Sequence, residues 1–127
     1  MAGVNGNVTF TEASEPWRSV KKVSAFWYTG SGDTNGQAWG QSANYYDGQL
    51  VGFSCRVNSG SPQNAYNVRV LDDENVDVLG GEGLNRDNAT NPFVAGSSLG
   101  AVAHSKLNVY IANANFNRNG TVVMYIR

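Results

Sequence analysis

The chain has 127 residues, of which 15% are charged, and its formal net charge at pH 7 is −1. This length fits one domain with a hydrophobic core. The balanced charge argues against the basic surface of a nucleic-acid-binding protein, and no apolar run approaches the roughly 18 residues of a membrane helix. The start, MAGVNGNVTF, lacks the basic and apolar regions of a secretory signal peptide. We therefore expect neither a nucleic-acid partner nor a membrane partner.

The counts of two residue types exclude several kinds of site. The chain has one cysteine, Cys55, and one histidine, His104. It therefore has no disulfide within the chain and no cysteine-based zinc site, and a catalytic triad would have to use His104. Cys55 fits a small buried apolar residue on a strand. We expect no catalytic residue, no cofactor and no metal, and we predict that the protein is not an enzyme.

Asparagine, glycine and serine together make up about a third of the chain, a composition that favours turns over helices. Residues 1–18 are predicted to be an extended N-terminal arm with a short possible strand at Val8–Phe10. Residues 19–127 are predicted to form a single domain. Its first strand is expected over 19–28, where Val23, Ala25 and Trp27 would share one face. Aromatic residues on both faces of this strand suggest that part of it meets a subunit or a loop.

A long glycine-rich loop is expected over 29–47 and a second one over 80–98. Further strands are predicted over 48–57, 66–72, 76–79, 106–112 and 121–127, because apolar and polar residues alternate there. The residues expected to face inward are Val51, Phe53, Cys55, Val57, Tyr66, Val68, Val70, Leu107, Val109, Ile111, Val122, Met124 and Ile126. Asn119-Gly120 is read as the tightest point of the last turn. The predicted fold class is all-β: an antiparallel β-sandwich, jelly-roll-like, with an extended arm.

Four carboxylates lie within six residues, at Asp72, Asp73, Glu74 and Asp77. Clustered carboxylate oxygens can bind calcium, but the spacing lacks the Asp-x-Asp-x-Asp-Gly pattern of a calcium loop. A solvated hairpin turn is the favoured interpretation.

Exposed aromatic residues are the best candidates for a binding surface. Trp39, Tyr45 and Tyr46 lie in the first long loop, where they could stack on sugar rings, anchor a protein interface or fold back to cap the core. Contact and capping are weighted equally here. Trp17 and Arg18 in the arm, and Phe93 in the second loop, complete the candidate contact residues.

The order of segments resembles a known family. These segments are Phe26-Trp27-Tyr28, Tyr46-Asp47-Gly48-Gln49-Leu50-Val51-Gly52, Ser61-Pro62, Asn64-Ala65-Tyr66-Asn67-Val68-Arg69-Val70, Val76-Asp77-Val78-Leu79-Gly80-Gly81, and the ending from Gly120 to Arg127. This layout resembles the capsid decoration, or cement, proteins of tailed bacteriophages, which are β-sandwich or jelly-roll proteins on the outside of the head.

The resemblance implies a structural virion protein, made in the cytoplasm of the host bacterium and located on the capsid exterior. It implies that the chain stabilises the shell by binding the major capsid protein, and that it forms a homo-oligomer, a trimer rather than a dimer. The arm 1–18 or the loops 29–47 and 80–98 would hold the neighbouring capsid proteins.

A second interpretation is a carbohydrate-binding or receptor-binding module on a phage tail, with Trp39, Tyr45 and Tyr46 as its stacking platform. A third is a small hydrolase that would depend on His104. The sequence supports the third least, because it contains no recognisable catalytic motif.

Overall fold

The computed structural model describes residues 7–11, 20–29, 37–59, 66–84, 94–95, 99–114 and 118–127. Within these ranges the chain is all-β and contains no helix, which confirms the predicted class at this level. The strands are β1 (Asn7–Thr11), β2 (Lys21–Tyr28), β3 (Ala38–Gln41), β4 (Tyr46–Ser59), β5 (Asn67–Leu71), β6 (Val94–Ala95), β7 (Ala101–Ser105), β8 (Asn108–Ala112) and β9 (Asn119–Ile126).

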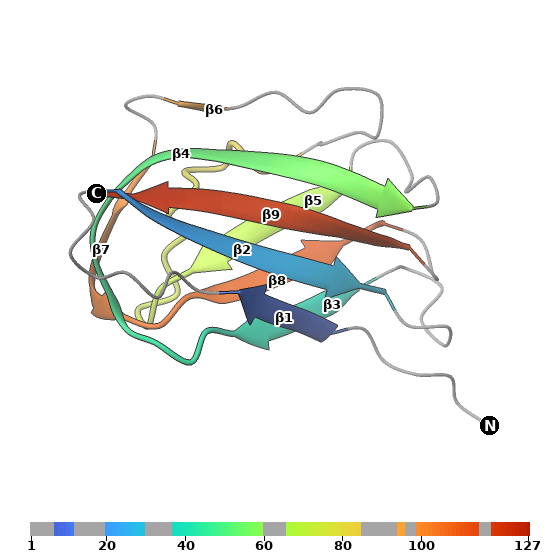
Figure 1. Ribbon diagram of the computed structural model, residues 1–127, viewed down its shortest axis with the longest axis horizontal. Helices are drawn as coiled ribbons and strands as arrows, with labels where there is room; N and C mark the ends of the chain where they lie inside the picture. The colour runs from blue at the N-terminus through green and yellow to red at the C-terminus, as the bar shows by residue number, and fades with distance from the viewer. Residues whose placement is uncertain are drawn as a thin grey trace.

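The larger sheet follows the order β1-β2-β9-β4-β6, with β7 also paired to β4. All its pairings are antiparallel. The long strand β4 makes this arrangement possible because it bends: its first residues pair with β7, and its later residues run beside β9. Figure 1 shows β4 curving around the end of the molecule at which the chain terminates.

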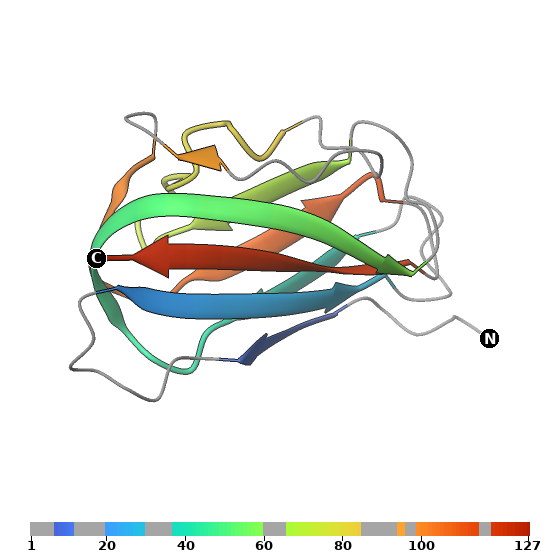
Figure 2. The same cartoon turned by 45° about the horizontal axis from the view of Figure 1, so that its top comes forward.

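The smaller sheet has the order β3-β8-β5 and lies behind the larger one (Figure 1). The two sheets curl together into a half-barrel, which the tilted view in Figure 2 shows from above. At one side β1 and β3 come close: a Cβ atom added to Gly40 would lie 2.6 Å from the Val8 carbonyl oxygen. A glycine at this position therefore lets the two sheets meet edge to edge.

The core fills the space between the two sheets. Trp27 of β2 is fully buried, and its ring centroid lies 5.7 Å from that of Tyr66, which precedes β5. Most of the residues predicted to face inward are buried, namely Phe53, Cys55, Tyr66, Val68, Val70, Leu107, Val109, Ile111, Val122, Met124 and Ile126. The strand periodicity of two therefore identifies this core from sequence.

The alternation predicted for the strand 48–57 is wrong at Val51, the first residue expected to face inward. Val51 is only half-buried, whereas Leu50 is fully buried. The pairing of β4 with β9 shifts between Leu50 and Gly52, so two residues of β4 stand opposite one of β9. This β-bulge moves the alternation by one position, and Gly52, which lies between the predicted inward positions Val51 and Phe53, is buried. The side chain of Val57 lies outside the described residues.

Three other predicted segments need correction. The loop expected over 29–47 contains β3 and the start of β4, and β7 forms where no strand was expected. The strand expected over 76–79 is a series of turns in which only Asp77 forms an isolated bridge, to Leu71.

Asn119-Gly120 belongs to strand β9 rather than to the tip of a turn. A Cβ atom on Gly120 would lie 2.4 Å from the Arg56 carbonyl oxygen and 2.6 Å from Cζ2 of Trp27. Glycine is needed here because the Trp27 ring and strand β4 occupy the space of a side chain.

Part of the predicted arm is a strand. Residues 7–11 form β1, which confirms the short strand expected at Val8–Phe10 and pairs along its length with β2. Val8 and Phe10 are half-buried and pack against the core. The division of the chain at residue 18 stays a prediction.

Candidate functional site

The three aromatic residues predicted to share one loop occupy three different environments. Trp39 lies on β3 and is 61% exposed, and Tyr45 precedes β4 and is 56% exposed. Tyr46 is only 5% exposed and belongs to the core. Tyr46 therefore fits the capping interpretation, and the three side chains do not form one platform.

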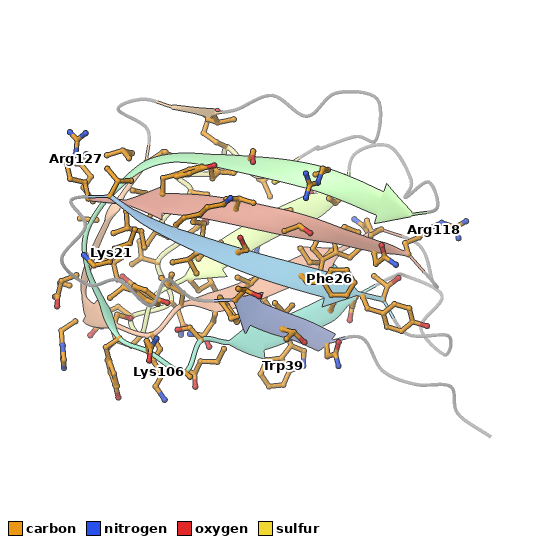
Figure 3. All side chains as sticks on the ribbon, viewed as in Figure 1. Lys21, Phe26, Trp39, Lys106, Arg118 and Arg127 are labelled. Carbon is orange, nitrogen blue, oxygen red and sulfur yellow. The ribbon has the colours of Figure 1, made fainter. Side chains whose placement is uncertain are left out.

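Trp39 belongs instead to a row that crosses the smaller sheet. In the strand register Trp39 stands opposite Tyr110 of β8, and Tyr110 stands opposite Arg69 of β5. The Trp39 and Tyr110 rings are stacked, with centroids 6.2 Å apart and planes 14° from parallel. All three side chains are exposed, because they point away from the core on the outer face of the sheet. Figure 3 shows Trp39 at the outside of the molecule beside β3.

Amide side chains flank this row on both sides. On one side Gln37, just before β3, and Asn67 of β5 line a pocket together with Trp39, Tyr110 and Arg69. The pocket has a volume of about 490 Å³. On the other side Gln41 donates a hydrogen bond to Oδ1 of Asn108 at 3.1 Å, and Asn108 donates to the Leu71 carbonyl oxygen.

His104 lies in a separate exposed cluster. Its backbone has a φ of 47°, and its amide N–H donates to Oδ1 of Asp47 at 2.6 Å. The Tyr45 ring stacks on the imidazole with centroids 4.8 Å apart, and Lys106 Nζ lies 5.4 Å from the centre of the Tyr45 ring. The neighbouring Ser105 hydroxyl donates to the Lys106 carbonyl oxygen, so it supports the backbone rather than His104.

The acidic segment 72–77 uses two of its carboxylates to hold its own backbone. Oδ1 of Asp72 accepts the amide N–H groups of Glu74 and Val76 at 2.9 Å each. Asp77 accepts those of Val70, Leu79 and Gly81. This is the structure expected of an Asx-type turn. Within the described ranges, no group of three or more histidine, cysteine or acidic residues could hold a metal ion.

The outer face of the larger sheet has a different composition. Phe26 is 42% exposed near the end of β2, and it stands between Thr9 of β1 and Thr121 of β9. The next row holds Thr11, Ser24, Val123 and Ser54. Lys22 on β2 and Arg56 on β4 supply cations, and no acidic residue occurs in either row.

Tyr110 and Arg69 alternate with residues that the sequence predicts to face inward, but they were not selected as contact residues. Both lie in strands where apolar and polar residues alternate clearly, so their exposure can be predicted from the sequence. Their position beside Trp39 depends on β3 pairing with β8, which the sequence pattern does not specify. Trp17, Arg18 and Phe93 lie outside the described residues.

Comparisons with known proteins found no matching family model, no matching curated protein and no matching solved structure. In the described part of the chain, no helix is long and apolar enough to cross a membrane.

Proposed function

We propose that this chain is a structural, non-enzymatic virion protein that decorates the outside of a tailed-phage capsid by binding the major capsid protein. The order of its segments resembles that of decoration proteins, and its antiparallel all-β fold is compatible with that family. In this proposal the two sheets are the layers of a β-sandwich of jelly-roll type, and the protein acts as a homo-oligomer, a trimer rather than a dimer.

The observation that carries the proposal is the outer face of the larger sheet. This face is rich in hydroxyl groups, carries the cations Lys22 and Arg56, and exposes Phe26 beside Thr9. Burying the Phe26 side chain against a partner would remove apolar area from water, which favours association. Binding to the assembled shell and not to free subunits stabilises the shell by mass action. We therefore assign this face to the major capsid protein or to a second copy of the chain.

Phe26→Ala tests this assignment. Purified chain is sedimented with empty shells of the major capsid protein encoded in the same genome, and the bound fraction is measured against concentration. We expect Phe26→Ala to weaken shell binding at least tenfold, which corresponds to about 1.4 kcal/mol. Trp39→Ala, which removes an exposed aromatic ring from the opposite sheet, is the matched control and should bind like the wild type.

Light scattering of the same samples reports the oligomeric state, so a weakened trimer is distinguished from a weakened shell contact. The proposal is wrong if the unmodified chain fails to sediment with the shells. The assignment of the face is wrong if Phe26→Ala neither weakens shell binding nor changes the oligomer.

A further inference from the structure

The outer face of the smaller sheet carries an exposed pair of stacked aromatic rings. Trp39 is 61% exposed and Tyr110 is 40% exposed, and they stand opposite each other on β3 and β8. Their rings lie 14° from parallel. Aromatic rings held on adjacent strands in this way form a fixed, solvent-facing stacking surface at little cost in side-chain entropy.

The groups around the rings narrow the choice of ligand. Amide side chains both donate and accept hydrogen bonds, and Gln37 and Asn67 line the pocket beside the rings. Sugar hydroxyls have the same dual character, while the C–H face of a pyranose ring fits the negative face of an aromatic ring. A polyproline segment offers acceptors only, and a phosphate chain would need more cations than the single arginine present here.

Arg69 adds a positive charge to this face. It stands opposite Tyr110 in the register of β5 and β8 and lines the same pocket. The three rows of this face hold amides, aromatics, Ala112, Leu71 and Arg69. The row of Leu71 continues to Asp77, whose carboxylate accepts the backbone amide N–H groups of Val70, Leu79 and Gly81. Among the described residues, no ion pair to Arg69 is formed. A guanidinium group exposed at the end of an aromatic row, next to Tyr110, suits a ligand that carries a carboxylate, which it can bind through two parallel hydrogen bonds.

We propose that this face binds a glycan that contains an acidic sugar: Trp39 and Tyr110 stack on pyranose rings, and Arg69 binds the sugar carboxylate. The pocket volume of about 490 Å³ lies within the range of small-ligand sites. The site differs from the platform expected from sequence, since Tyr110 and Arg69 take the places of Tyr45 and Tyr46. It lies on the opposite sheet from Phe26, so the inference does not rest on capsid binding.

The test is a glycan array that carries neutral oligosaccharides together with oligosaccharides containing uronic or sialic acids. The full chain is biotinylated and displayed on streptavidin, because several copies raise the avidity for weak ligands. The best ligand is then titrated by calorimetry. We expect binding to be confined to acidic glycans and to weaken at least tenfold in Trp39→Ala and in Tyr110→Ala. Arg69→Gln should abolish the preference for the acidic form over its neutral analogue.

Two matched controls remove exposed aromatic rings from other places. Tyr45→Ala and Phe26→Ala should bind the glycan like the wild type, and thermal unfolding of each variant reports whether it is folded. The proposal is overturned if no glycan on the array binds, if Trp39→Ala and Tyr110→Ala retain full affinity, or if Tyr45→Ala loses as much. The assignment to acidic glycans is wrong if the wild-type chain prefers neutral glycans and Arg69→Gln keeps that preference. Shell sedimentation is a separate measurement, so a negative result on the glycan array does not change the conclusion about capsid binding.

Discussion

Asp77 links β5 to the turns that follow it. Its Oδ1 atom accepts the amide N–H groups of Val70 and Leu79 at 3.3 and 3.1 Å, and its Oδ2 atom accepts that of Gly81 at 3.1 Å. The backbone of this segment also bonds to β5, from the Val78 amide to the Val70 carbonyl oxygen at 2.8 Å. The carboxylate therefore organises the segment that covers the edge of the smaller sheet.

Asp77→Ala should destabilise the fold. It leaves three amide donors without their acceptor. Hydrogen bonds to charged groups contribute about 1.5–3 kcal/mol each in protected sites and less where water can replace them. We therefore expect the free energy of unfolding to fall by about 2–3 kcal/mol. Urea denaturation measures the change. Glu74→Ala is the control, because it removes the same charge from an exposed position in the same segment and should change stability by less than about 0.5 kcal/mol. Equal effects of the two substitutions would contradict a structural role for the Asp77 carboxylate.

Residue type alone did not decide which aromatic side chains are exposed. Tyr45 and Tyr46 are adjacent in sequence, yet Tyr45 stacks on His104 at the surface and Tyr46 is buried. The difference arises because Tyr46 begins β4 and pairs with Ser105 of β7. That pairing joins residues far apart in the chain, and β7 itself was not predicted from sequence.

At the scale of elements, strands with an unbroken alternation were predictable. The segments 66–72, 106–112 and 121–127 correspond to β5, β8 and β9, with the expected side chains buried. Prediction was less accurate where geometry breaks the period. The bulge at Val51 shifts the buried positions of β4, and β3 has only 4 residues between polar and glycine-rich neighbours, too few for a periodic signal. The strand predicted over 76–79 does not form, because the Asp77 carboxylate accepts backbone amide N–H groups that would otherwise take part in strand pairing.

Strand β1 covers the edge of β2, so its removal should lower the stability of the fold. It pairs with β2 from Asn7 to Thr11, packs Val8 and Phe10 against the core, and closes the gap toward β3. Deleting residues 1–11 should lower the free energy of unfolding by about 2–4 kcal/mol, as expected for the loss of two half-buried apolar side chains.

The same deletion should increase self-association, because it exposes the edge of β2. Urea denaturation reports the stability, and light scattering behind a sizing column reports the mass. Thr9→Ala, a change on the exposed face of β1 that keeps the strand, should alter neither. A shortened chain with unchanged stability and mass would show that β1 is dispensable for the fold.

On the scale of the whole molecule, two exposed faces with different chemistry lie on opposite sheets. The larger sheet presents hydroxyl groups and Phe26, whereas the smaller one presents stacked aromatic rings, amides and Arg69. If the larger sheet rests on a shell, the smaller sheet faces outward. One small domain can then serve two partners without competition between them.

The low content of charged residues determines how strongly salt should affect the contact between the larger sheet and the shell. The chain has 9 basic and 10 acidic residues, and the rows around Phe26 contain Arg56 and no acidic side chain. Raising the salt concentration from about 0.01 M to 1 M shortens the screening length from about 30 Å to about 3 Å, which weakens contacts between charges and leaves apolar contacts intact. Shell binding measured by sedimentation should therefore change by less than about threefold over this range. Heat-inactivated chain is the control for non-specific pelleting. A loss of affinity of more than about tenfold between low and moderate salt would mean that charge pairs, rather than the Phe26 face, hold the protein on the capsid.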